Sequence, residues 1–286
     1  MKLSQARFAF TLLVVTVATS GCSIVNNIRA KNQLNEGAAA YKAGRFAEAQ
    51  KHFQSASELD PSQQNAPLFI ARAIHAQYRP GVDTPENVAK AQEAIEAYKK
   101  VLENNFNDAS ADNAYNSVAY LYRQLKEEQR EEEWLTTRAN LDSAPKEKRS
   151  DAYTVLASKQ WNCSYDITEQ KENKETIDKA NVVVVQYKKP KDQAEFDKAR
   201  NCTMKGLELS NKAIELNANN SSAWSYKTNL LREMAKFSQM ENKPDEKARY
   251  DKEADEAEAI QKRLNEEAKR RKEEEEAKKS PSPPTS

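Results

Sequence analysis

Small and large apolar residues recur at helical spacing in the segment 36–61, EGAAAYKAGRFAEAQKHFQSASELDP. Ala49, Phe53 and Ala56 lie three and four residues apart, so they share one face of a helix. Gly44 indicates the end of a preceding helix, because a residue without Cβ readily takes the left-handed conformation that closes helices. The proline at the end of the segment stops the second helix. The pattern therefore predicts two short helices that pack closely, small residues against large ones.

The spacing of these residues resembles the tetratricopeptide repeat (TPR), a helical hairpin of about 34 residues. The tryptophan and leucine that the family places early in its first helix are replaced by Gln33 and Glu36. The resemblance implies an all-α, TPR-like solenoid, in which stacked hairpins bury the apolar faces that no single hairpin can bury. The residues that match are Gly37, Gly44, Phe46, Ala49, Phe53, Ala56 and Pro61.

Further hairpins follow the first with less regular spacing. Ala71 lies one repeat length after Gly37, and Trp224 opens the last unit. We therefore expect a solenoid of about five hairpins over residues 31–268, with an unrelated helical bundle as the alternative. The later helices are expected at 91–102, 114–125, 126–141, 151–161, 207–216, 223–237 and 244–268.

The apolar spacing stops after residue 268. The segment 269–279 is nearly all charged, and several of its glutamates precede a lysine or arginine by four residues, a spacing that stabilises exposed helices. We therefore expect the last helix to be long and charged at its end. The Pro/Ser segment 280–286 is expected to be a disordered tail, which completes a C-terminal region of 269–286.

The N-terminus has the pattern of an export signal. Two basic residues precede an apolar run over 8–18, which is short for a membrane span. Small residues then precede Cys22, an arrangement that resembles a bacterial lipoprotein signal. The resemblance implies removal of residues 1–21, acylation of Cys22, a linker over 22–30, and a lipid anchor in the cell envelope facing the periplasm, with the outer membrane favoured. An ordinary secretory signal with a chance cysteine is the alternative.

Two cysteines bracket an insertion at about 164–195 in the fourth hairpin. Cys163 and Cys202 would lie on adjacent antiparallel helices, and an exported chain meets an oxidising compartment. We therefore predict a disulfide between them, with two buried thiols as the alternative. Inside the insertion, a β-branched run at 181–187 predicts a strand. This strand is expected to pair with 164–168 as a small hairpin or to present an edge to another protein.

The composition and motifs of the chain give no support for nucleic-acid binding, metal binding or catalysis. The net charge of +1 on 286 residues gives no basis for nucleic-acid binding. The histidines, His52 and His75, do not belong to a cluster with metal-ligand spacing, and the few glycines do not form a phosphate-binding loop. No catalytic residue, metal or cofactor is therefore predicted, and an enzyme is the least favoured class.

The TPR resemblance implies that another protein binds the concave face, which is formed by the first helix of each hairpin. Arginine, asparagine and tyrosine on that face suit peptide backbones and carboxylates. We therefore expect a membrane-anchored interaction scaffold for an envelope protein or peptide segment, and the alternative is a structural spacer without a ligand. The residues placed on this face by the helical register are Tyr41, Arg72, His75, Asn116, Tyr120, Arg123, Asn229 and Arg232.

Overall fold

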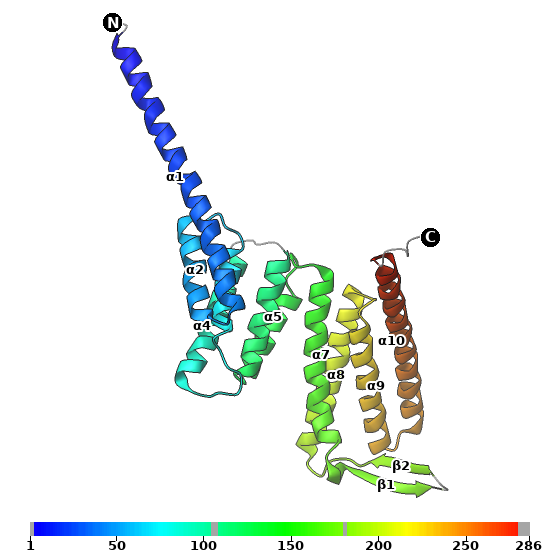
Figure 1. The fold of residues 1–286 in the computed structure, drawn as a ribbon. Coiled ribbons are helices and arrows are strands. Elements are labelled where there is room, and N and C mark those ends of the chain that lie inside the picture. Colours follow the sequence, from blue (N-terminus) through cyan, green and yellow to red (C-terminus); the bar gives the residue numbers. More distant parts are fainter. Residues whose placement is uncertain (1–2, 104–107, 180–181, 280–286) are drawn as a thin grey trace, which may run out of the picture. The chain divides into compact units, whose positions relative to one another are not determined.

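The computed structural model describes residues 3–103, 108–179 and 182–279 of the chain (Figure 1). The regular elements of the described residues are helices, apart from one pair of short strands, so the predicted all-α class is confirmed. The chain forms two compact units, Met1–Glu131 (unit 1) and Glu132–Ser286 (unit 2). Among the described residues, no helix combines the length and the apolar character needed to span a membrane.

Unit 1 is built from helical hairpins in which each helix packs on the next one along the chain. The first hairpin is followed by a second and by the first helix of a third. Pro67 lies in the first turn of the third helix, a position that needs no backbone N–H. The elements are α1 (Leu3–Lys42), α2 (Phe46–Leu59), α3 (Ala66–His75), α4 (Pro85–Glu103) and α5 (Asp108–Gln124), and α6 (Glu128–Ala139) spans the boundary of the two units.

Small-to-large packing holds the first hairpin together as the sequence predicts. A Cβ atom on Gly37 would lie 2.5 Å from Cε1 of Phe53, so α1 and α2 can approach this closely only with glycine at that position. Phe53 is buried together with Ala40 and Ala49. Gly44 closes the turn between the helices with a positive φ of 74°, the conformation that glycine adopts without strain.

The first helix is longer than predicted. The pattern indicated a short helix after a linker at 22–30, whereas α1 is continuous through that segment. Ala30 is fully buried, and the Asn27 side chain donates a hydrogen bond of 2.7 Å to Asp60 at the end of α2. These contacts with α2 hold the segment in helical form. The side chain of Cys22 lies outside the described residues.

Unit 2 contains the fourth and fifth hairpins. The helices pack in chain order, and α7 also contacts α9. Phe196 and Phe237 meet edge to face, with ring centroids 5.5 Å apart, in the core. Gly206 repeats the small-to-large packing, because a Cβ atom there would lie 2.6 Å from Cδ2 of Leu230. The elements are α7 (Lys146–Thr168), η1 (Lys171–Asn173), β1 (Lys174–Lys179), β2 (Val182–Tyr187), α8 (Gln193–Leu216), α9 (Ser221–Met240) and α10 (Pro244–Lys279).

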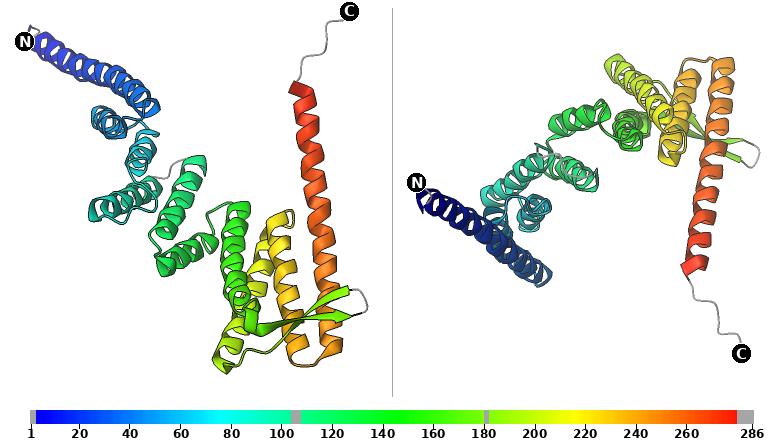
Figure 2. Two further views of the ribbon diagram at one scale, coloured as in Figure 1. Left: turned by 60° about the horizontal axis from the view of Figure 1, so that its bottom comes forward. Right: turned by 90° about the horizontal axis from the view of Figure 1, so that it is seen from above.

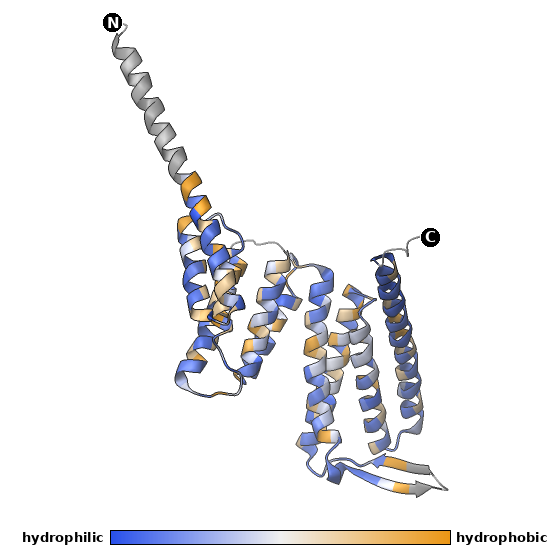
Figure 3. Cartoon of the chain, in the orientation of Figure 1, coloured by the Kyte–Doolittle hydropathy of each residue, from blue (hydrophilic) through white to orange (hydrophobic). Residues whose placement is uncertain are grey.

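The last helix extends well beyond its packing against α9 (Figure 2). Its buried residues are Ala254, Ala257 and Leu264, and the turns that follow are hydrophilic almost throughout (Figure 3). Repeated ion pairs at i,i+4, such as Lys269 with Glu273, lie on this exposed part. The predicted long, charged C-terminal helix is therefore confirmed, and the tail at 280–286 lies outside the described residues.

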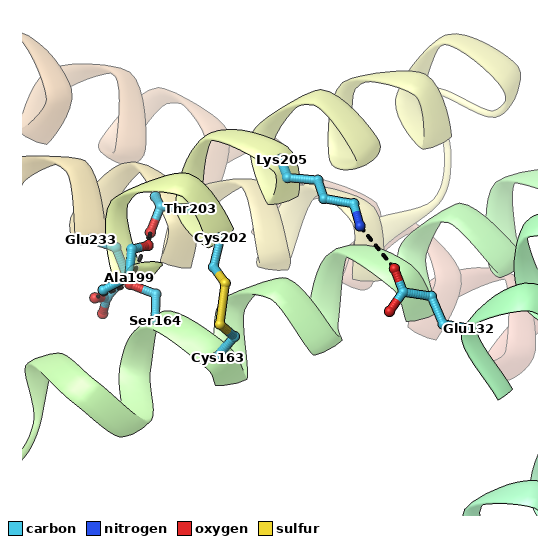
Figure 4. The surroundings of a disulfide bond; sticks show 8 residues. All are labelled: Glu132, Cys163, Ser164, Ala199, Cys202, Thr203, Lys205 and Glu233. Atoms are coloured by element: carbon cyan, nitrogen blue, oxygen red, sulfur yellow. Dashed lines mark hydrogen bonds and ion pairs between the residues drawn. A yellow bond between two sulfur atoms is a disulfide. The ribbon is translucent and has the colours of Figure 1, made fainter. Parts of the chain in front are cut away.

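The predicted disulfide is present. Cys163 on α7 and Cys202 on α8 are bonded, with Cα atoms 6.1 Å apart (Figure 4). The bond closes a loop that contains the whole insertion. By the loop-entropy model such a cross-link stabilises the folded chain by about 4 kcal/mol.

The predicted small β-hairpin is present in the insertion, but the prediction that 164–168 forms its other strand was wrong. The strand β2 forms where the β-branched run lies, but it pairs antiparallel with β1, with Thr176 opposite Val185. The segment 164–168 is instead the last turn of α7, with Ser164 and Thr168 one turn apart and both buried. Both hydroxyls donate hydrogen bonds to Glu233 of α9, and these contacts favour the helix.

Candidate functional site

The helices α1, α2 and α3 form a small apolar pocket in unit 1, which we call the α1–α3 pocket. Its volume is about 160 Å³. Phe53 and Phe69 supply aromatic rings whose centroids are 5.3 Å apart. Tyr41, which is 37% exposed, packs its ring edge-on against Phe46 at 5.2 Å. The lining residues are Ala38, Tyr41, Lys42, Phe53, Phe69 and Arg72.

Two cations, Lys42 and Arg72, stand beside this apolar surface. Neither forms an ion pair with any residue that the structure describes, and the guanidinium of Arg72 donates only to the amide oxygen of Asn113, at 3.3 Å. By contrast, Arg45 forms an ion pair with Glu48 at 2.7 Å. The α1–α3 pocket therefore combines an apolar cavity with two cations that have no ion-pair partner in the described part of the chain.

Aromatic and imidazole groups continue the same face from α3 to α5. His75 lies one turn after Arg72 on α3, and its Nδ1 is 3.2 Å from the hydroxyl of Tyr98. The ring of Tyr120, on α5, lies 5.7 Å from the imidazole and is 39% exposed. Burial lowers the pKa of His75, so the imidazole is neutral at pH 7. His75 and Tyr120 thus add uncharged groups that can form hydrogen bonds to the face that carries the two cations.

The other predicted binding residues have different surroundings. Asn116 is exposed on α5. Arg123 donates two hydrogen bonds of 2.8 and 2.6 Å to the carboxylate of Glu131, which is 1% exposed. In unit 2, Asn229 and Arg232 lie on α9, and Arg232 pairs with two carboxylates of α10 at 3.0 and 3.1 Å. The structure therefore brings together Tyr41, Arg72, His75 and Tyr120, whereas Arg123 and Arg232 are occupied by ion pairs within their own units.

Lys42 and the phenylalanines of the pocket were not predicted as site residues. A signal for the two cations exists in the sequence. No acidic residue lies three or four positions before or after Lys42, and the same is true of Arg72. Cations on a helix without such neighbours lack the usual local ion-pair partner, so their charge is available for a ligand.

A buried polar cluster in unit 2 has a structural role. The carboxylate of Glu233, 2% exposed, accepts hydrogen bonds from Thr168 at 2.8 Å and from Lys236 at 2.6 Å. Lys236 also donates to Glu169, at 2.7 Å, and Glu169 accepts a further bond from Tyr187 of β2 at 2.8 Å. Burial opposes ionisation of Glu169, but these donors together with Lys174 outweigh it and lower its pKa to about 2. The cluster thus joins α7, α9 and β2. No group of side chains suited to a metal ion occurs in the described parts of the chain.

The arrangement defines a class of fold: stacked TPR-like helical hairpins whose helices approach at glycine and alanine positions. No protein-family model matches the chain, and no curated protein matches it. A crystal structure of MamA protein resembles it at 15% identity and a TM-score of 0.40, over 82% of this chain and 94% of that one. The TPR2AB domain of yeast Sti1, in a structure titled as a complex with pHSP90, has 16% identity and a TM-score of 0.33, over 82% and 98% of the two chains. A tetratricopeptide repeat protein from Parabacteroides merdae has 15% identity and a TM-score of 0.33, over 83% and 98%.

Proposed function

We propose that the protein is a non-catalytic interaction scaffold that binds a segment of another protein at the α1–α3 pocket. The observation that supports this proposal is the pairing of an apolar cavity with two cations, Lys42 and Arg72, that lack carboxylate partners among the described residues. A segment with a large apolar side chain beside a carboxylate fits both features. The side chain fills the cavity, and the carboxylate accepts charge-assisted hydrogen bonds from the two cations.

The surface beside the pocket favours a polypeptide over a small molecule. At about 160 Å³ the cavity holds one side chain, below the range of about 300–1,000 Å³ of small-ligand sites. The face then continues over His75 and Tyr120, whose ring and hydroxyl groups suit the backbone of an extended segment. Arginine and tyrosine are also the residue types that contribute most at protein interfaces.

The affinity should be modest. Burial of one large apolar side chain contributes about 1.5–3 kcal/mol, and each hydrogen bond to a charged group contributes about 1.5–3 kcal/mol. The loss of translational and conformational freedom offsets a large part of this sum. We therefore expect a Kd on the order of 10 µM and a clear dependence on ionic strength, because the cations are partly exposed.

The proposal includes a place for the scaffold: a lipid anchor at Cys22 in the bacterial envelope, facing the periplasm, with the outer membrane favoured. The sequence of residues 1–22 supports it through its resemblance to a lipoprotein signal. A disulfide in unit 2 suits an oxidising compartment. Membrane fractionation of cells carrying Cys22→Ala tests the anchor: loss of the protein from the membrane fraction is expected, and retention there contradicts the anchor.

The binding proposal is tested by photo-crosslinking in intact cells, with a benzoylphenylalanine in place of Tyr41. Charge reversal by Lys42→Glu with Arg72→Glu should remove the crosslinked partner. The matched control, Lys31→Glu with Lys51→Glu, changes two exposed cations of α1 and α2 outside the pocket and should retain it. Crosslinks that survive the first pair as well as the second would refute the site. The absence of any crosslinked protein would favour the structural spacer.

A further inference from the structure

A second pocket lies within unit 2, among α7, α9 and α10, and has a volume of about 330 Å³. We call it the amide pocket, because Asn229, Gln261 and Asn265 contribute its side-chain amides. Two aromatic residues, Trp161 and Tyr226, and three serines near the start of α9 complete its lining. None of these lining residues is charged, although charged residues make up 31% of the chain.

The absence of charge is most informative on α10. Apart from Tyr250, the only uncharged polar residues in this helix are Gln261 and Asn265, and both line the pocket. They are four residues apart, so they lie on one face of the helix. Neither amide, nor that of Asn229, forms a side-chain hydrogen bond within the described residues. An otherwise charged helix therefore directs its two available amides at the same cavity.

The aromatic residues form a row that begins in the pocket and continues along α7. The ring centroids of Trp161 and Tyr226 are 6.1 Å apart, and those of Trp161 and Tyr165 are 4.9 Å apart. Tyr165 is 40% exposed. Exposed rings offer flat apolar faces, and the tyrosine hydroxyl and indole N–H add hydrogen-bonding groups at their edges.

We infer that the amide pocket binds an uncharged carbohydrate chain. A sugar ring presents several hydroxyls, each a donor and an acceptor, and an amide side chain offers both functions in return. The apolar face of the ring packs on an aromatic side chain such as Trp161. The lining contains no charged residue that could pair with an acidic or basic peptide. An apolar segment could pack only against the two aromatic residues of the lining. The row ends at Tyr165, whose exposed ring has the Lys236 ammonium 5.4 Å from its centroid and provides one further contact position, which favours a chain over a single sugar.

The size of the pocket agrees with this ligand class, since small-ligand sites span about 300–1,000 Å³. The inference does not depend on the proposed function, because the amide pocket lies in unit 2 and uses neither Lys42 nor Arg72. Charge reversal at these two cations should therefore leave carbohydrate binding unchanged, and this variant distinguishes failure of one proposal from failure of the other.

Calorimetric titration of the full chain with chitotetraose, cellotetraose and maltotetraose tests the inference. We expect saturable binding of at least one of them, with a Kd below about 1 mM. Gln261→Ala with Asn265→Ala should weaken it at least about tenfold, because each amide loses hydrogen bonds to the sugar. Trp161→Phe should retain more affinity than Trp161→Ala. Asn162→Ala, an exposed amide beside Trp161 that does not line the pocket, is the matched control and should bind as the unmodified chain does.

Three results would overturn the inference. One is the absence of saturation by all three oligosaccharides up to about 10 mM, a range that detects even weak specific binding. Another is binding that the double amide variant leaves unchanged while its circular dichroism melting curve matches that of the unmodified chain. Tighter binding of an uncharged, asparagine- and glutamine-rich peptide than of any sugar would also replace the carbohydrate with a polypeptide ligand.

Discussion

Replacement of Gly37 by alanine tests whether close approach of α1 and α2 determines the stability of unit 1. The new Cβ would lie 2.5, 2.6 and 3.0 Å from three atoms along one edge of the Phe53 ring. The ring has little room to withdraw, because Phe53 is 4% exposed and packs against Phe69 at a centroid distance of 5.3 Å. The substitution should therefore force the two helices apart.

The magnitude follows from two opposing effects. Alanine is a better helix former than glycine by about 1 kcal/mol, which favours the variant. Overpacking of a buried site costs about 1–3 kcal/mol, and overlap with three ring atoms places this case at the upper end. The net result is a loss of about 2 kcal/mol. In a Phe53→Leu background the overlap is relieved, so Gly37→Ala should there be neutral or stabilising, and the two substitutions should be coupled by about 2 kcal/mol.

Hydrogen exchange read by mass spectrometry is the suitable assay, because a chain of two units need not unfold in a single transition. Amides of α1 and α2 should exchange about 30-fold faster in Gly37→Ala, the equivalent of 2 kcal/mol, while peptides from unit 2 serve as the internal control. Gly206→Ala is the matched substitution in unit 2, where the atoms nearest to the new Cβ are the terminal methyl carbons of Leu230. Slower exchange of α1 and α2 in Gly37→Ala would show that helix propensity outweighs packing and would refute the reasoning.

Two further predictions concern the disulfide and His75. Cys163→Ser with Cys202→Ser should lower the free energy of unfolding of unit 2 by about 4 kcal/mol and leave unit 1 unchanged, and identical melting curves with and without reductant would contradict this. Burial lowers the pKa of His75 below its usual value of 6.5, so the imidazole is protonated more easily in the unfolded chain. The free energy of unfolding of unit 1 should therefore fall as pH decreases through 6.5. It should reach a constant lower value at pH values below the pKa of His75 in the folded chain. Urea unfolding at a series of pH values should show that His75→Gln removes this dependence, and an unchanged dependence in the variant would assign it to other groups.

The hairpins were predictable because their signals are local. Glycine at a left-handed position, proline in a first turn and small residues at helical spacing each act within a few residues. The partner of β2 was not predictable in this way. The charged sequence of β1 has no strong strand signal, and segment 164–168 is kept helical by Glu233, whose partners lie 65 and 69 residues away in the chain.

The residues of the candidate site likewise differ in how much the sequence alone could predict about them. Helical register placed Arg72 and His75 correctly beside each other, since both lie on one face of one helix. Register alone could not show which cations already have partners. Arg123 meets Glu131 across the turn between α5 and α6, and Arg232 meets carboxylates on the next helix. Those pairings depend on tertiary contacts, and they separate the available cations from the occupied ones.

The disulfide has a consequence for how the insertion can change. The disulfide holds the Cα atoms of Cys163 and Cys202 at a separation of 6.1 Å. Cys163 lies near the end of α7, and Cys202 lies within α8. Strands β1 and β2 lie between the two cysteines, and doubling the length of a connecting loop costs only about 0.6 kcal/mol in closure entropy. A reporter or an affinity module inserted in the sequence between β1 and β2 should therefore leave the helices of unit 2 in register.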